Sequence, residues 1–257
     1  MGGVTTAPNS SARAATGEDG SRAELSAVNW SDVAAQLDGH GFAMTPPVLT
    51  AGQCAAMIAA FDDDALFRST IDMARHSFGE GRYRYFADPL PELVAGLRTS
   101  LYPPLAEIAN RWAVQLGGAD AGEPLFPEDH AELVARCADA GQHKPTPLLL
   151  RYGATGYNCL HQDVYGDLLF PLQVLVMLNT PDQDFTGGES VFVEQRPRQQ
   201  SRPMVARPGL GQAVIFPVRT RPRLGTRGYH RVQMRHGVSA VHSGHRHVLG
   251  IIFHNAR

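Results

Sequence analysis

Apolar positions recur at two different spacings along this 257-residue chain, and the change between them divides it. In the first half they return every three or four residues, which places side chains on one face of an α-helix. From Pro147 onward they form short apolar or alternating runs separated by Gly, Pro and polar clusters, the pattern of strands. The pattern predicts helices first and a strand-rich region after them.

Three segments of the first half carry the helical spacing: 30–37, 51–61 and 92–116. The last is the longest, and Pro103-Pro104 is expected to break or kink it because proline removes a helical hydrogen bond. Between the second and third helices, residues 69–86 favour strands around a turn at Gly79-Glu80-Gly81. A loop with a short helix near 128–137 is expected before the strand region begins.

Six short runs in the second half are predicted to be strands. They are 148–152, 168–178, 190–194, 212–218, 230–233 and 248–254. Many short strands after a helical first half indicate an antiparallel barrel or sandwich with helices packed outside it. The expected fold class is therefore α+β.

The domain organisation is predicted from composition. Residues 1–25 are expected to form a disordered tail, because this stretch is rich in Ser, Ala, Gly and Thr and lacks the apolar segment of a secretory signal. Residues 26–257 are expected to form one compact domain. Within it, 26–146 would be a helical and strand support region and 147–257 the catalytic core.

The bulk composition bounds the class of protein. A hydrophobic share of 43% and a charged share of 19% are typical of soluble globular proteins. No stretch of about 18 uninterrupted apolar residues is present, so no membrane span is expected. Three scattered cysteines, Cys54, Cys137 and Cys159, argue against a disulfide framework and favour a reducing compartment, the cytoplasm. The oligomeric state is not predicted.

Charge is distributed unevenly along the chain. From Val191 onward there are twelve Arg, no Lys and one acidic residue, Glu194, a formal charge of +11 that leaves −13 for the rest. Two interpretations remain open: an anionic partner such as nucleic acid, or mutual neutralisation of the two halves. The alternating run Arg82-Tyr83-Arg84-Tyr85 and the Arg-rich segment 219–231, predicted to be a loop, suit nucleic acid or an ordinary solvated surface.

A pattern of metal-ligating residues carries the chemistry. His161-Gln162-Asp163 reads H-x-D, and His236 follows 73 residues after Asp163. Residues i and i+2 of a strand point to the same side, so His161 and Asp163 can bind one metal. Two histidines and one carboxylate make the facial triad that holds non-haem Fe(II) and leaves coordination positions open. His161, Asp163 and His236 are therefore the predicted metal ligands.

Arg246 lies ten residues beyond His236, among apolar residues of a predicted strand. A buried charge needs a partner, and arginine offers a bidentate fork suited to a carboxylate. A binding module without turnover would not need such a group. Arg246 is thus predicted to bind a carboxylate cosubstrate, with a salt bridge at the barrel rim as the alternative.

Three segments together resemble one family. Residues 152–163 are similar to the Y-G-x-G-x-Y-x-x-H-x-D run of the prolyl-hydroxylase-like branch of Fe(II)/2-oxoglutarate oxygenases. Residues 174–179 followed by Gly187-Gly188-Glu189 resemble its hairpin, and 236–246 resemble its H-x4-V-x-x-G-x-R/K ending. The resemblance covers roughly residues 148–254. The chain also looks like a bacterial oxygenase group described as acting on damaged DNA.

The resemblance implies a double-stranded β-helix, the jelly-roll or cupin-like core. It assigns His161, Asp163 and His236 to iron and Arg246 to the distal carboxylate of 2-oxoglutarate. Tyr152 is a second candidate for binding the cosubstrate. Where the family often has a tyrosine on the strand after H-x-D, this chain has Met177, so Tyr152 or Ser239 is expected to supply that hydrogen bond, unless the pocket differs.

The implied activity is that of a dioxygenase using Fe(II), 2-oxoglutarate and O2. It would hydroxylate a C–H bond and release succinate and CO2, with demethylation as the outcome where the carbon is bound to nitrogen. The partners would be 2-oxoglutarate and a primary substrate. A prolyl or other peptidyl residue, alkylated nucleic acid and a small molecule all remain open as that substrate, and a non-catalytic metal-binding jelly-roll module is the alternative of another class.

Overall fold

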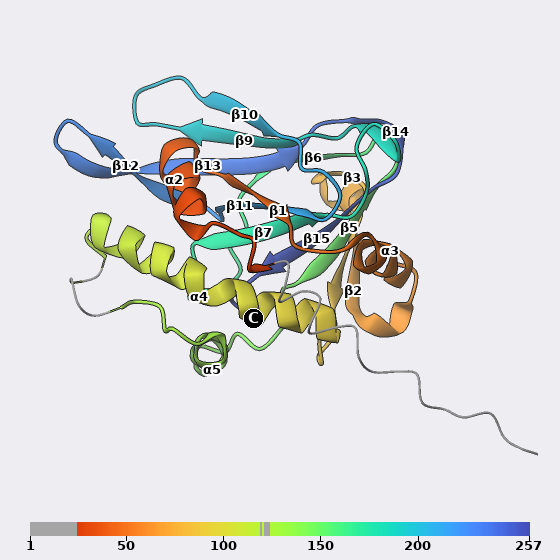
Figure 1. Cartoon of the computed structure of the whole chain (residues 1–257), viewed down its shortest axis with the longest axis horizontal. Helices are drawn as coiled ribbons and strands as arrows, with labels where there is room; N and C mark the ends of the chain where they lie inside the picture. The colour runs from red at the N-terminus through yellow and green to blue at the C-terminus, as the bar shows by residue number, and fades with distance from the viewer. Residues whose placement is uncertain (1–24, 119, 121–123) are drawn as a thin grey trace, which may run out of the picture.

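The strands of the protein form two facing sheets. The computed structural model describes residues 25–118, 120 and 124–257 (Figure 1). The tail predicted for residues 1–25 lies outside the described residues except for its last position. The larger sheet has seven antiparallel strands in the order β1 (Ala43–Pro47), β11 (Gln212–Pro217), β7 (Leu172–Met177), β15 (Arg246–Ile252), β5 (Leu148–Tyr152), β4 (Arg82–Phe86) and β2 (Phe67–Asp72).

The second sheet faces the first across the interior. Its strands are β10 (Arg202–Ala206), β9 (Ser190–Gln195), β13 (Gly228–Val238), β6 (Tyr157–His161) and β3 (Gly79–Glu80), with β12 (Thr220–Gly225) paired to β13. A separate pair is formed by β8 (Phe185–Gly187) and β14 (Val241–Gly244). Two antiparallel sheets from one winding chain are the jelly roll, so the predicted α+β class with a double-stranded β-helix is confirmed.

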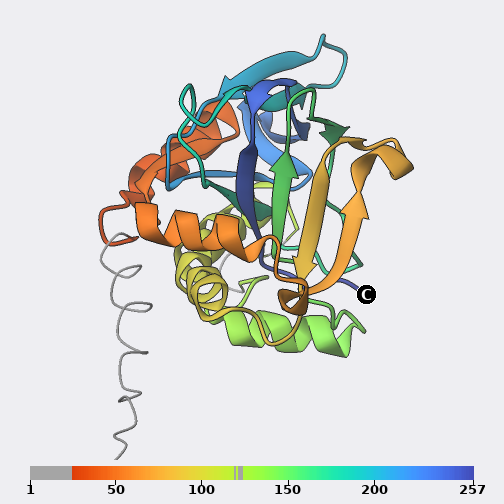
Figure 2. The same cartoon turned by 90° about the vertical axis from the view of Figure 1, so that its right-hand side faces the viewer.

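The helices cover the outside of the larger sheet (Figure 2). They are α2 (Trp30–His40), α3 (Ala51–Ala60), α4 (Glu92–Gln115) and α5 (His130–Asp139), with short 3-10 turns at Asp64–Leu66 and Met73–His76. Strand β7 shows why two layers form. Its even positions, such as Val174 and Val176, join the core beneath the helices, while Leu175 and Met177 face the interior between the sheets.

Helix α4 differs from its prediction because it runs through Pro103-Pro104 without a break. Leu101, Tyr102 and Leu105 on either side are fully buried in the main core. Burial of this length of apolar surface stabilises the helix by more than the missing backbone hydrogen bonds cost. No helix of the described residues is long and apolar enough to cross a membrane.

Two predicted irregular segments are strands instead. The turn expected at Gly79-Glu80-Gly81 is wrong, because Gly79 and Glu80 form β3 and pair with β6. A Cβ at Gly79 would collide with the backbone of Tyr157, so glycine permits this close pairing. The loop expected at 219–231 is also wrong, because it forms the β12–β13 hairpin, paired from Thr220↔Gln233 to Gly225↔Gly228.

The alternation predicted for Arg82-Tyr83-Arg84-Tyr85 is present, but Arg84 does not serve an outside partner. It is 8% exposed, and its guanidinium donates to the carbonyl of Phe61 (2.5 Å) and to Asp64 (2.5 Å). Tyr83 lies on the opposite face, toward the interior. The division of the chain between residues 146 and 147 stays a prediction.

Candidate metal centre and carboxylate pocket

One cavity of approximately 540 Å³ lies between the two sheets. Both sheets contribute to its wall: β6 and β13 on one side, β5, β7 and β15 on the other. His161, Asp163, His236 and Arg246 all line it. A cavity of this size with a few polar groups on an apolar wall is typical of a small-molecule site.

The two histidines meet because of strand register. His161 is the last residue of β6, and His236 lies opposite it on β13 as its antiparallel partner. Asp163 follows two residues after β6 and turns back to the same point. Its Oδ2 lies 3.1 Å from His236 Nε2, and its Oδ1 lies 3.6 Å from His161 Nε2.

These three side chains are arranged as a metal site requires. One ligand atom from each lies within 4.8 Å of the others. The chemistry of the donors, two imidazoles and a carboxylate, is that of non-haem Fe(II) sites with open coordination positions. The structure thus brings together the three residues singled out from the sequence, and their assignment as iron ligands belongs to the proposal below.

Electrostatics hold the donors in their ligating forms. Burial alone would raise the pKa of Asp163, but the adjacent His236 and His161 and the bond from Tyr165 outweigh it and hold the pKa well below its usual range. Burial and the neighbouring His236 lower the pKa of His161. An ionised carboxylate and a neutral imidazole are the forms that bind metal ions.

Two hydrogen bonds orient these donors. His161 Nδ1 lies 2.8 Å from the carbonyl of Cys159, which directs Nε2 toward Asp163. Tyr165 donates its hydroxyl to Asp163 Oδ1 at 2.6 Å. Burial raises the pKa of Tyr165 well above its usual value, so the hydroxyl stays protonated and can donate. Tyr165 was not predicted from the sequence, although its place two residues after Asp163 puts it within reach.

Arg246 opens β15 and is 1% exposed. Its Nη2 donates to Ser190 Oγ at 3.0 Å, and its guanidinium carbon lies 5.5 Å from the centre of the Tyr152 ring. Its Nε has no hydrogen-bond partner among the residues that the structure describes. No acidic side chain of the described residues forms an ion pair with it. Burial lowers the pKa of Arg246 to about 10, so the group is charged at neutral pH. A buried cation without a counter-ion fits a carboxylate ligand.

The glycine before the Glu189-Ser190 pair makes room for this arginine. Gly187, the last residue of β8, and Gly188 have positive φ values of 71° and 62°. A Cβ at Gly188 would lie 3.0 Å from Arg246 Cδ. Glycine at this position therefore leaves room for the arginine stem.

Tyr152 is fully buried and lies opposite Arg246 in the sheet register. Its hydroxyl accepts a hydrogen bond from Asn158 Nδ2 at 3.3 Å. Met177 packs with Tyr152 in a small apolar cluster. Ser239, the other expected donor, is not among the described residues that line the cavity, and its hydroxyl donates to Glu189 instead.

Other histidines of the C-terminal region lie outside the cluster. His242 and His245 are exposed. His247 is buried with its Nδ1 3.0 Å from Asn179 Oδ1, and His254 Nδ1 accepts from the backbone N–H of Phe170 at 3.2 Å. His236 is the histidine that register places beside His161.

The fold is shared with 2-oxoglutarate- and Fe(II)-dependent oxygenases. An oxidoreductase of that family from Burkholderia pseudomallei is 18% identical, with a TM-score of 0.50, and the alignment covers 89% of this chain and 93% of that one. A Pseudomonas putida prolyl-4-hydroxylase is 16% identical with a TM-score of 0.52, over 89% and 100%. The epimerase SnoN from nogalamycin biosynthesis is 15% identical with a TM-score of 0.54, over 86% and 80%.

Sequence comparison gives the family. The profile of Oxygenase-NA, described as an oxygenase catalysing oxidative methylation of damaged DNA, matches residues 81–256, and the chain belongs to this family. The uncharacterized protein Rv2227 of Mycobacterium tuberculosis is 43% identical over 171 residues, which are 66% of this chain and 72% of that protein. The protein is therefore an oxygenase, an enzyme of the oxidoreductase class, as the sequence motifs predicted.

Proposed function

We propose that the protein is an Fe(II)- and 2-oxoglutarate-dependent dioxygenase that hydroxylates a C–H bond and releases succinate and CO2. One observation carries this proposal: the cluster of His161, Asp163 and His236 shares its cavity with Arg246, a buried cation that has no counter-ion among the described residues. A bound metal accounts for the cluster, and a dicarboxylate cosubstrate accounts for the buried arginine. A metal-binding module without turnover accounts for the first feature only.

Each residue has a role in this proposal. His161, Asp163 and His236 would hold Fe(II), which together with 2-oxoglutarate and O2 supplies the oxidising power. Arg246 would bind the distal carboxylate of 2-oxoglutarate, and Tyr152 would form the wall against which that carboxylate is held. Tyr165 keeps the Asp163 carboxylate oriented through its hydrogen bond.

We further propose damaged nucleic acid as the substrate class, with an N-linked methyl group as the carbon that is oxidised. The matching family is described as acting on damaged DNA, which supports this substrate class. Hydroxylation of such a methyl gives an N-hydroxymethyl group, which breaks down to the free N–H and formaldehyde. Peptidyl hydroxylation is the second candidate, favoured by the motif order and spacing from Tyr152 to Arg246. A cytoplasmic location stays a prediction.

The test is release of succinate from 2-oxoglutarate under Fe(II) and O2, screened against methylated oligonucleotides, peptides and metabolites. His161→Ala and Asp163→Ala are each expected to abolish turnover and to weaken Fe(II) binding measured by calorimetry without O2. His245→Ala, an exposed histidine outside the cluster, is the matched control and should retain both. Full activity in both cluster variants would remove the assigned ligands, and metal binding with no 2-oxoglutarate consumption would favour the non-catalytic module.

A further inference from the structure

Two arginine-rich hairpins build much of the smaller sheet. Strands β9 and β10 form one, and β12 and β13 form the other, and both extend from the same side of the molecule (Figure 1). Eleven of the twelve C-terminal arginines precede Arg257, and most of them lie in or between these strands. The question is which of these charges the protein itself neutralises.

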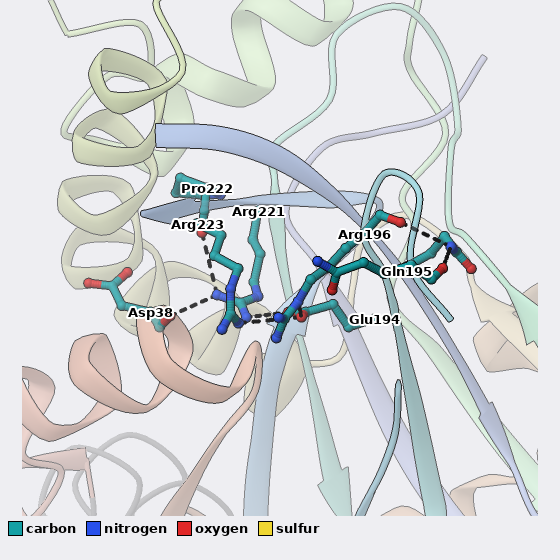
Figure 3. Close-up of polar contacts among 8 residues, drawn as sticks. Asp38, Glu194, Gln195, Arg196, Arg221, Pro222 and Arg223 are labelled. Atoms are coloured by element: carbon teal, nitrogen blue, oxygen red, sulfur yellow. Dashed lines mark hydrogen bonds and ion pairs between the residues drawn. The ribbon is translucent and has the colours of Figure 1, made fainter. Parts of the chain in front are cut away.

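Glu194 is the one acidic residue from Val191 onward, and its carboxylate is already paired with arginines inside the protein. It is 1% exposed and accepts hydrogen bonds from Arg196 at 2.6 Å, from Arg223 at 3.4 Å and from Arg221 (Figure 3). Arg221 also donates to the carbonyl of Asp38 on α2 at 2.7 Å. This cluster joins the two hairpins to the helix layer and occupies the single carboxylate of the segment from Val191 to Arg257.

Two other arginines are paired with acidic residues that precede Val191. Arg207 binds Asp182 at 2.9 Å, and Arg257 binds Asp167. Neutralisation between the halves, the alternative left open by the sequence, therefore accounts for a small part of the charge.

Six exposed arginines remain. None of them has a side-chain hydrogen bond or ion pair within the part of the chain that the structure describes. They are Arg198, Arg202, Arg219, Arg227, Arg231 and Arg235. Arg202 lies opposite Glu194 in the register, on the inward face of the smaller sheet, and we call the other five the arginine surface. Unpaired like charges on two neighbouring hairpins repel one another, so this surface attracts a polyanion.

The arginine surface begins at the cavity. Gln162, between two of the predicted iron ligands, lines the cavity and donates its Nε2 to the carbonyl of Arg219 at 3.0 Å and to Gln233 Oε1 at 3.1 Å. On β13 the alternation places Arg231, Gln233 and Arg235 outward, while His236 continues the inward row of Val232 and Met234. One strand therefore carries both a predicted ligand and two surface arginines.

Apolar side chains at the cavity favour a nucleic acid over other polyanions. Phe78 and Leu160 both line the cavity and are 47% and 45% exposed. The Phe78 ring stacks on His76 at 5.4 Å between centroids. Phe78 thus offers one exposed aromatic ring at the cavity, and such rings combined with arginines bind single-stranded nucleic acid through stacked bases and neutralised phosphates.

We propose that the arginine surface binds the sugar-phosphate backbone of a single nucleic-acid strand and directs one base past Phe78 and Leu160 into the cavity. This inference rests on the proposed function for the fate of that base, but the backbone contact can be tested apart from turnover. The residues that would hold the strand lie in β13, in the two hairpin turns and, at Arg219, just before β12.

The test is fluorescence anisotropy of the full chain with a labelled single-stranded oligonucleotide of about 16 nucleotides, the upper site size of an OB-fold. Arg231→Glu combined with Arg235→Glu is expected to weaken binding at least about tenfold near physiological salt. Loss of two phosphate contacts should also reduce the slope of log K against log salt by about 1.4. Arg231→Lys with Arg235→Lys keeps both charges and should retain most of the affinity.

The matched control carries the same change in charge elsewhere. Arg136→Glu with Lys144→Glu alters exposed residues of α5 and of the segment after it, on the opposite side of the molecule from β9 and β10. Equal losses in both double variants would reduce the effect to net charge and overturn the proposal. Binding of phosphatidylserine vesicles or polyglutamate in place of oligonucleotides would overturn it as well. Thermal unfolding of each variant confirms that it is folded.

Failure of this inference and failure of the proposed function are distinguishable. If oligonucleotide binding depends on Arg231 and Arg235 while no oligonucleotide stimulates succinate release, the surface stands and the substrate assignment fails. If methylated oligonucleotides are oxidised while the Glu double variant binds them as the unaltered protein does, the substrate assignment stands and the surface is wrong.

Discussion

Arg221 and Arg246 are the same chemical group in two different surroundings. Each side chain begins on a barrel strand and is 1% exposed. Arg221 has a buried carboxylate partner in Glu194 (Figure 3), whereas Arg246 has the hydroxyl of Ser190 and the ring of Tyr152. The first lies outside the cavity lining, and the second forms part of it.

The difference distinguishes a buried charge that stabilises the fold from a buried charge that binds a ligand. Removing a guanidinium from water is costly, and a carboxylate placed beside it offsets that cost. At Arg221 the protein provides this carboxylate. At Arg246 none of the described residues does, so the offset has to come from a bound anion. The two arginines should therefore respond in opposite ways to the same substitution.

Arg221→Met is expected to have the largest effect, and the effect should be on stability. The substitution leaves Glu194 buried without its most enclosed partner, and breaking a buried pair in this way costs about 3–5 kcal/mol. Denaturant unfolding measures the loss, and adding Glu194→Leu should recover about half of it because the unpaired charge is then removed. The affinity for 2-oxoglutarate should not change. A stable single variant would mean that Arg196 and Arg223 satisfy Glu194 without Arg221.

Arg246→Met should show the reverse pattern. Calorimetry with 2-oxoglutarate, with Co(II) in place of iron, is expected to show about a 100-fold loss of affinity, equal to about 2.8 kcal/mol. The free energy of unfolding without ligand should stay the same or rise, since a buried unpaired charge is replaced by an apolar chain of similar length. An unchanged affinity would place the carboxylate anchor elsewhere.

Of the two arginines, only the role of Arg246 could be predicted from the sequence. Arg246 could be recognised because it ends a family motif and lies between apolar residues. The burial of Arg221 could not, because it depends on Glu194, 27 residues away on another strand. The Arg-rich segment 219–231 therefore looked like a solvated loop, whereas tertiary pairing makes it a hairpin.

The metal site likewise combines a feature that the local sequence predicts with one that depends on distant parts of the chain. The spacing of His161 and Asp163 is a property of one strand, so it is readable from the sequence. The meeting of His161 and His236 depends on the register of β6 against β13, which no local pattern specifies. The family resemblance supplied this long-range information, but it did not indicate Tyr165 or Ser190, whose hydroxyls support the site through single hydrogen bonds.

Acid pH should sharpen the contrast between the two arginines. Burial raises the pKa of Glu194, but hydrogen bonds and charge from Arg196 and Arg221 outweigh it, so the folded pKa lies below its usual value of 4.5. The stabilisation is thus complete above pH 4.5 and is lost as pH falls through the folded pKa. Urea unfolding against pH should show a shallower acid loss in Glu194→Gln than in the unaltered protein. Arg246→Met should keep the unaltered acid slope, because no carboxylate of the described residues pairs with that arginine.

Ser190→Ala should give the smallest effect and the finest test of the comparison. Ser190 accepts the one hydrogen bond that Arg246 makes with the described residues, at 3.0 Å. Removing a single hydrogen bond to a charged group costs about 1.5 kcal/mol, or about a tenfold loss of 2-oxoglutarate affinity if the hydroxyl orients the guanidinium. Ser190→Thr keeps the hydroxyl and should restore most of the affinity. If both variants bind 2-oxoglutarate as the unaltered protein does, Arg246 is oriented by the Tyr152 ring and the close packing of Gly188 rather than by Ser190.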